Sequence, residues 1–201
     1  MAFIATVPVG EAAGDVRALY ERYETKLGYV PNYAKVLSQR PQVAAAWSAL
    51  QAAIRGGMEE RRWELVTMAA ARAMRNSYCA LAHGEILRRR FYSPEQLAAI
   101  ADDFRRSELS SADKAVLGFA EMIVHDATAV TEADIQNLRV QGFSDAEIFD
   151  IAAAAAARCF FSKLLDGLGA EPDSAYLELE EGLRRRLAVG RRVSKEALEH
   201  V

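Results

Sequence analysis

Helix-start signals recur along this chain, and they decide its fold class. Ser93-Pro94-Glu95-Gln96 gives a capping serine, a proline in the first turn and then an acid. Ser144-Asp145-Ala146-Glu147 matches a capping box, and Thr131-Glu132-Ala133-Asp134 opens a further helix in the same way. No segment shows a clear alternation of apolar and polar residues, which is the pattern of a half-buried strand. The sequence therefore predicts an all-α protein built as a helical bundle.

Apolar residues at helical spacing place the individual helices. The expected ranges are 14–26, 43–55, 59–75, 112–125 and 133–141, with further helices running from Cys79 towards Arg90, from Ser93 onward and from Ser144 to Leu165. In the second of these ranges, one buried stripe is expected from Val43, Trp47, Leu50 and Ile54. Pro31 is expected to break the helical pattern, because it pushes Val30 out of helical geometry.

At 201 residues the chain is long enough for one domain with a sizeable core, and no low-complexity linker divides it. Residues 1–174 are interpreted as one helical domain, and residues 175–201, rich in Leu, Glu and Arg, as a C-terminal helical extension or tail. The small side chains of residues 151–157 let helices approach closely, which indicates a central helix or a subunit interface. Together with the many apolar stripes, this run predicts a homo-oligomer.

The composition argues against several classes of function. A net charge of -3 leaves no basic excess to neutralise phosphates, so a nucleic-acid partner is not expected. The alanine-rich run 151–157 is too short to span a membrane, and the N-terminal stretch lacks the pattern of a signal peptide. The two cysteines, Cys79 and Cys159, form no disulfide framework, which suits a reducing cytoplasm. Neither metal-ligand spacing nor a Gly-rich phosphate loop occurs, so no metal and no cofactor are predicted.

The segment Asn76-Ser77-Tyr78-Cys79-Ala80-Leu81-Ala82-His83 carries the candidate chemistry. Residues four apart share a helix face, so His83 can exchange a proton with the thiol of Cys79. With Asn76 or Ser77 as the N-cap, Cys79 lies in the first turn, where free N–H groups and the helix dipole favour a thiolate. The alternative is structural, since a free cysteine most often only fills space in a core. Cys159, in a strongly apolar stretch, is expected to be such an inert core thiol.

Glu64 is a candidate third member of this site. If the break at Asn76-Ser77 folds the two flanking helices back on each other, Glu64 can approach His83. The carboxylate would then orient the imidazole, and the imidazole would ionise the thiol. The alternative is that Glu64 is one more surface acid, like Glu59 and Glu60.

Several segments in this order and at this spacing resemble the carboxymuconolactone decarboxylase superfamily. The resemblance is to its AhpD-like (alkylhydroperoxidase D-like) branch and, within that, to the peroxidase-related proteins. It covers about residues 10 to 175. The segments that carry it are Gly28-Tyr29-Val30-Pro31-Asn32, Arg40-Pro41, Met58 to Val66, Asn76 to Gly84, Val130 to Asp134, Leu138 to Asp145 and Phe160 to Gly169.

The resemblance implies a site and an activity. Redox members of the family carry a Glu and then a Cys-x-x-Cys-x-x-x-His motif, which fall here on Glu64, Cys79 and His83, with Asn76 in place of the first cysteine. The implied activity is reduction of a hydroperoxide by Cys79, with His83 oriented by Glu64 taking the thiol proton and Tyr78 donating to the leaving oxygen. A lone cysteine cannot close an intramolecular disulfide, so an external thiol reductant is implied. The implied assembly is a dimer, trimer or hexamer of all-α subunits.

Two other functions stay open from the sequence. One is a lyase of the carboxymuconolactone decarboxylase type, with His83 as the proton carrier and Arg72 and Arg75 available for a carboxylate substrate. The other is a non-catalytic helical oligomer that has kept the fold and lost the redox cycle, which the replacement of the first cysteine by Asn76 favours.

Overall fold

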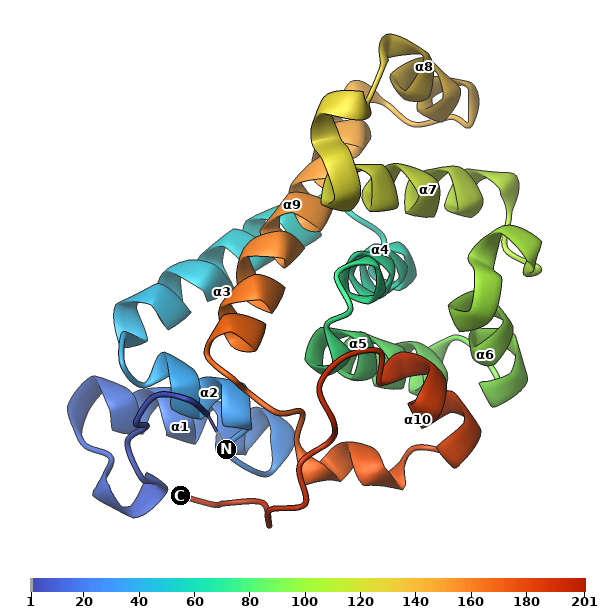
Figure 1. Ribbon diagram of the computed structural model, residues 1–201. Helices are drawn as coiled ribbons and strands as arrows, with labels where there is room; N and C mark the ends of the chain where they lie inside the picture. Colours follow the sequence, from blue (N-terminus) through green and yellow to red (C-terminus); the bar gives the residue numbers. More distant parts are fainter. Residues whose placement is uncertain (1) are drawn as a thin grey trace.

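The computed structural model describes residues 2–201. Across this part of the chain the backbone forms ten α-helices and no strand, so the all-α prediction is confirmed (Figure 1). The helices are α1 (Gly14–Leu27), α2 (Asn32–Leu37), α3 (Pro41–Arg55), α4 (Glu60–Ala73), α5 (Ser77–Arg90), α6 (Pro94–Asp103), α7 (Ser111–Asp126), α8 (Glu132–Val140), α9 (Asp145–Gly167) and α10 (Glu181–Leu187). None of the helices in residues 2–201 is long and apolar enough to cross a membrane.

Most helices begin where the capping residues predict. Ser93 and Ser144 each accept a hydrogen bond from the N–H three residues on, and both form complete capping boxes, as does Thr131. Such caps satisfy N–H groups that the helix itself leaves unpaired. The short helix α2 was not expected, because its six residues follow Pro31 and have no capping side chain.

Helix α4 lies at the centre of the molecule, with α5, α7 and α9 packed around it (Figure 1). Every residue from Trp63 to Ala71 is buried. Most of them are apolar, as burial on all sides requires. Glu64 is the charged exception, with 1% of its surface exposed. Because a buried carboxylate costs free energy unless it is paired and hydrogen-bonded, Glu64 requires a partner on a neighbouring helix.

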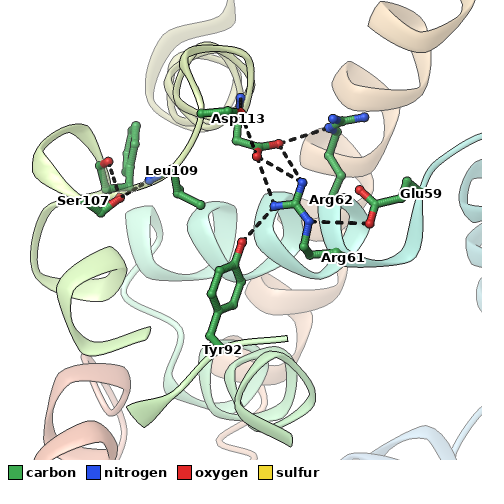
Figure 2. A network of polar contacts seen from close by, with 9 residues as sticks. Glu59, Arg61, Arg62, Tyr92, Ser107, Leu109 and Asp113 are labelled. Atoms are coloured by element: carbon green, nitrogen blue, oxygen red, sulfur yellow. Dashed lines mark hydrogen bonds and ion pairs between the residues drawn. The ribbon is translucent and has the colours of Figure 1, made fainter. Parts of the chain in front are cut away.

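A network of charged side chains fixes the start of α4 against α7 (Figure 2). Arg61 donates to both carboxylate oxygens of Asp113, at 3.0 to 3.4 Å, and also to the hydroxyl of Tyr92 at 2.8 Å. Arg62 adds a contact of 3.3 Å to the same carboxylate. Burial alone would raise the pKa of Asp113, but hydrogen bonds from Arg61 and Ser110 outweigh it, and the pKa is lowered. The network therefore holds a charged Asp113 and fixes the first turn of α4, one turn before Glu64.

A tight turn folds α5 back along α4. Arg75 adopts the left-handed conformation, with a φ of 59°, that glycine more often supplies at the end of a helix. The N–H of Asn76 then donates to the carbonyl of Ala71 at 2.8 Å, and α5 begins at the next residue. This reversal brings two helices together that are consecutive in the chain, which is the geometry that the Glu64 hypothesis required.

The buried stripe of α3 differs from the predicted one. Trp47 and Ile54 are buried as expected, but Val43 is 38% and Leu50 48% exposed. The buried face is rotated by one residue and runs through Ala44, Trp47, Gln51 and Ile54, with Gln51 half-buried. Alanine and glutamine give a weak hydrophobic signal, so the sequence pattern followed the larger apolar side chains instead. The rotation matters because it turns Gln51 towards α9.

Helix α9 packs against α3, α4 and α7 (Figure 1). One side of its alanine-rich run is buried within the chain, at Ile151, Ala154 and Ala155. This confirms a central position for the helix. The opposite side remains outside, where Phe149 is 69% and Phe160 is 49% exposed. The small residues therefore serve packing inside one chain, and the larger aromatic residues of α9 face away from it.

The C-terminal segment packs back onto the helical body. Its helical prediction is confirmed for a 3₁₀ turn, Ser174–Glu178, and for α10, while residues 188–201 are not helical. Leu187 is fully buried against Gly84 of α5, where an added Cβ would lie 2.5 Å from a Leu187 methyl carbon. Gly190 donates its N–H to the hydroxyl of Ser77 at 2.7 Å. These contacts leave the N-terminal turn of α5 covered by the end of the chain.

Candidate active site

Asn76 is the N-cap of α5, and its side chain is fully buried. Its amide oxygen accepts a hydrogen bond from the N–H of Cys79 at 2.8 Å. Its amide nitrogen donates to the carboxylate of Asp166 at 2.8 Å and to the carbonyl of Ser162 at 3.2 Å. The residue that stands at the position of a second cysteine thus has a structural task, which is to hold the first turn of α5 against α9. Of the two caps that the sequence allowed, the structure selects Asn76.

Cys79 lies in this first turn with 3% of its surface exposed. Its sulfur accepts a hydrogen bond from Nη1 of Arg158, on α9, at 3.5 Å. The guanidinium charge and the N-terminal end of the helix both favour a negative charge at this sulfur. A cysteine that only filled space in the core would be surrounded by apolar atoms, so the charged contact distinguishes Cys79 from an inert thiol.

Arg158 was not predicted as a site residue, although the sequence contains a signal for it. It is 3% exposed and lies on the buried face of α9, in line with Ala154, Phe161 and Leu165. A charged residue on an otherwise apolar stripe is rarely buried without a specific role. The apolar surroundings of Arg158 and Cys159 were interpreted as ordinary core, and the position of Arg158 on the inner face was overlooked.

Polar and aromatic groups hold the guanidinium of Arg158. Nη2 donates to the side-chain oxygen of Gln51 at 3.4 Å, and the guanidinium carbon lies 5.7 Å from the ring of Trp47 and 5.8 Å from that of Phe161. These two rings are stacked on each other, with centroids 4.8 Å apart. Within residues 2–201, no carboxylate forms an ion pair with Arg158, and its Nε is buried without a hydrogen-bond acceptor.

His83 and Glu64 form the second half of the site. Nδ1 of His83 lies 2.5 Å from Oε2 of Glu64, so the expected approach of these two residues is confirmed. Burial lowers the pKa of His83 and the charge of Arg158 lowers it further, against the opposing effect of Glu64. Burial would raise the pKa of Glu64, but His83, Arg55 and Arg158 outweigh it and lower that pKa. The pair is therefore a carboxylate and a neutral imidazole.

The protonation of the pair follows from this contact. A carboxylate can only accept a hydrogen bond, so Nδ1 of His83 must carry the proton that points at Glu64. The other ring nitrogen, Nε2, is then free to act as a base. Because the charge of Arg158 acts on both members of the pair, Cys79, His83, Glu64 and Arg158 belong to one electrostatic cluster. Glu64 and His83 meet here; the sulfur of Cys79, one helical turn from His83, takes its hydrogen bond from Arg158.

The hydroxyl of Tyr78 is occupied by other groups. It donates to the carboxylate of Asp173 at 2.5 Å and accepts from the N–H of Tyr33 at 3.1 Å. Asp173 also accepts from the N–H of Asn32 at 2.7 Å, and burial raises its pKa to about 6. Tyr78 is 2% exposed, and its single proton is directed at Asp173. This geometry corrects the predicted role of Tyr78 as a proton donor to substrate: it ties α5 to the start of α2.

Arg72 and Arg75 also lie outside this cluster. Arg72 donates to the backbone carbonyls of Ala101 and Arg186, and Nε of Arg75 donates to the carbonyl of Val189 at 3.4 Å. Both arginines therefore attach the C-terminal segment to the end of α4. Cys159 is a free, half-buried thiol, and burial raises its pKa.

Comparison with known proteins agrees with this geometry. The sequence model of the carboxymuconolactone decarboxylase family matches residues 41–121, which include Glu64, Cys79 and His83. No curated protein matches the sequence. The crystal structure of an uncharacterized peroxidase-related protein with an alkylhydroperoxidase AhpD core, from Ralstonia eutropha, is 27% identical and has a TM-score of 0.79. That alignment covers 87% of this chain and 94% of the other.

Two further structures share the fold. An uncharacterized peroxidase-related protein from Silicibacter sp. has a TM-score of 0.79 at 22% identity, over 88% of this chain and 94% of its own. The debrominase Bmp8, as a cysteine-to-alanine variant in complex with 2,3,4-tribromopyrrole, has a TM-score of 0.70 at 19% identity, over 92% and 95%. The chain thus belongs to the carboxymuconolactone decarboxylase superfamily, and its helices form the AhpD-like fold of the peroxidase-related proteins.

Proposed function

We propose that this protein reduces hydroperoxides through the thiol of Cys79, with His83 and Glu64 as its proton relay. One observation carries the proposal. The sulfur of Cys79, at the start of α5, accepts a hydrogen bond from a buried arginine, and a neutral imidazole held by a carboxylate follows one turn later. A low-pKa thiol beside a base is the minimum apparatus of thiol redox chemistry in general.

The reaction starts with transfer of the thiol proton to Nε2 of His83. The Glu64 carboxylate, hydrogen-bonded to Nδ1, stabilises the imidazolium that forms. The thiolate then attacks the terminal oxygen of the hydroperoxide. An S–O bond forms and the O–O bond breaks, so sulfur is oxidised by two electrons to a sulfenic acid. The leaving alkoxide takes the proton from His83 and departs as an alcohol.

The reduction of the sulfenic acid requires an external thiol. Asn76 stands at the position of a second cysteine, so an intramolecular disulfide cannot form there. One external thiol displaces water from the sulfenic acid and leaves a mixed disulfide on Cys79. A second thiol then releases the disulfide of the reductant and restores Cys79.

Relatives support thiol redox chemistry in general terms. The 27% identical structure is a peroxidase-related protein with an AhpD core. The lyase alternative is weakened, because Arg72 and Arg75, which would have bound a carboxylate substrate, bind backbone carbonyls of other segments instead. The non-catalytic alternative does not account for a buried arginine on the sulfur of Cys79.

The test measures peroxide consumption and the oxidation state of the cysteine. Wild-type protein, Cys79→Ser and Cys159→Ser receive one equivalent of a hydroperoxide, and a dimedone adduct identifies any sulfenic acid by mass spectrometry. We expect one adduct per chain on Cys79 in the wild type and in Cys159→Ser, and catalytic turnover when an excess of a small thiol is added. Cys79→Ser should have neither. Equal peroxide consumption by Cys79→Ser and the wild type would exclude the proposal.

A further inference from the structure

Arg158 is a buried cation whose described contacts do not neutralise it. It is 3% exposed, and its hydrogen bonds lead to the sulfur of Cys79 and the amide oxygen of Gln51. Buried arginines are usually paired with a carboxylate, because an unpaired buried charge costs several kcal/mol. Here the Glu64 carboxylate is hydrogen-bonded to His83 instead. The arrangement is therefore costly for folding, and it places positive charge at one atom, the sulfur.

We propose, on the basis of the thiol reaction described above, that Arg158 is a catalytic residue. Its Nη1–H holds the sulfur of Cys79 as a thiolate, and another N–H of the same guanidinium binds the oxygen that leaves when the O–O bond breaks. The second role follows from spare donors. A guanidinium has five N–H groups, and the described contacts of Arg158 use one on Cys79 and one on Gln51, while Nε is buried without a partner.

The charges of the cluster balance in this scheme. Before the reaction the cluster holds a negative Glu64, a positive Arg158, a neutral His83 and a neutral thiol. Proton transfer from Cys79 to His83 creates one negative and one positive charge, so the sum does not change. When the S–O bond forms and the O–O bond breaks, the negative charge moves from sulfur to the leaving oxygen, and Arg158 remains beside it. The nearby Arg55 is exposed and paired with Glu60 at 2.7 Å.

The surroundings of Arg158 are suited to this task. Stacked rings of Trp47 and Phe161 confine the guanidinium, and Gln51 holds Nη2. A planar, rigid group with several donors can contact two atoms at once, whereas an ammonium group offers a single point of charge. Donors that are already oriented stabilise developing charge without reorganisation during the reaction.

The experiment compares Arg158→Met, Arg158→Lys and the wild type by two measurements. The first is the alkylation rate of Cys79 by iodoacetamide at neutral and at alkaline pH, which requires no peroxidase activity. We expect the neutral-pH rate to fall by about 10-fold or more in Arg158→Met, the effect of losing a hydrogen bond from a charged donor. At alkaline pH, where the thiolate forms without help, the rates should converge. Arg158→Lys should keep most of the neutral-pH rate, because it keeps the charge.

The second measurement is the rate of sulfenic acid formation with hydrogen peroxide at alkaline pH. There both variants should be slower than the wild type, because neither has the spare N–H groups for the leaving oxygen. If Arg158→Met does not fold, Gln51→Leu replaces it, since it frees the guanidinium and should change both rates in the same direction. Equal neutral-pH alkylation in the wild type and the folded variants would overturn the role of Arg158 at the thiolate. A wild type that is alkylated as expected but never oxidised would instead overturn the peroxidase function.

Discussion

The amide oxygen of Asn76 accepts the N–H of Cys79 at 2.8 Å, so the residue in place of a second cysteine caps the helix that carries the first. Its amide nitrogen also holds α9 through Asp166. This double task explains how a protein of this fold can keep an ordered thiol turn without a cysteine pair. It also sets the cost of restoring the pair.

We predict that Asn76→Cys creates a reversible disulfide with Cys79, because the N-cap and the third residue of a helix are close enough to bridge. The reduced variant should be less stable by about 1 kcal/mol or more, since the cap is lost. Its peroxide consumption with excess dithiol should exceed that of the wild type. Asn76→Ser is the matched control, because it keeps a capping oxygen and adds no thiol. A variant that forms the disulfide but consumes no more peroxide than Asn76→Cys/Cys79→Ser would count against a redox site.

Glu64→Gln tests the proton relay. The amide keeps the shape of the side chain but removes the charge that stabilises a protonated His83, so sulfenic acid formation at neutral pH should slow by about 10-fold or more. Glu64 raises the pKa of His83, and its removal should therefore lower that pKa and shift the acid limb of the rate profile to lower pH. Glu60→Gln, on the same helix but paired with surface arginines, is the control. An unchanged acid limb in Glu64→Gln would show that His83 is not the base.

Asp173 predicts a specific dependence of stability on pH. Its pKa is raised from 3.8 to about 6 by burial, so the folded chain binds this proton more tightly than the unfolded chain does. Between about pH 4 and pH 6 its contribution to the free energy of unfolding must therefore fall as the pH rises, by roughly 3 kcal/mol in total. Urea unfolding of the wild type and Asp173→Asn across this range isolates that contribution as a difference between the two chains.

The same pair of residues provides a second check. The hydrogen bond from Tyr78 lowers the pKa of Asp173, so Tyr78→Phe should extend the unstable range to higher pH. A pH-independent difference between the wild type and Asp173→Asn would mean that Asp173 is charged throughout this range.

The exposed aromatic residues of α9 predict self-association. Phe149 and Phe160 lie on its outer side together with Ala156, next to the exposed Leu50 of α3. Glutamate at both phenylalanines should convert an oligomer to a monomer in light scattering at micromolar concentration, because charge would be buried at the contact. Val140→Glu, at another exposed apolar residue, on α8, should leave the mass unchanged. A wild type that is already monomeric would contradict the prediction.

Local signals in the sequence were sufficient for the helices and for one half of the site. Ser93, Ser144 and Asn76 cap their helices through hydrogen bonds to residues three positions on, so the information is contained in a few neighbouring residues. The one-turn spacing of Cys79 and His83 is a property of any helix. The break before α5 indicated the reversal that carries Glu64 to His83, which the structure confirms.

The other half of the site depended on packing between distant segments. Arg158 reaches Cys79 across 79 residues, and Gln51 reaches Arg158 across 107, because α3, α5 and α9 meet in the folded chain. Tyr78 was interpreted as catalytic until Asp173, 95 residues away, proved to accept its proton. A single sequence states which side chains share a helix face, but the face that turns inward is chosen by the burial of all the helices together. That choice is a collective result of core packing, and only the tertiary structure contains it.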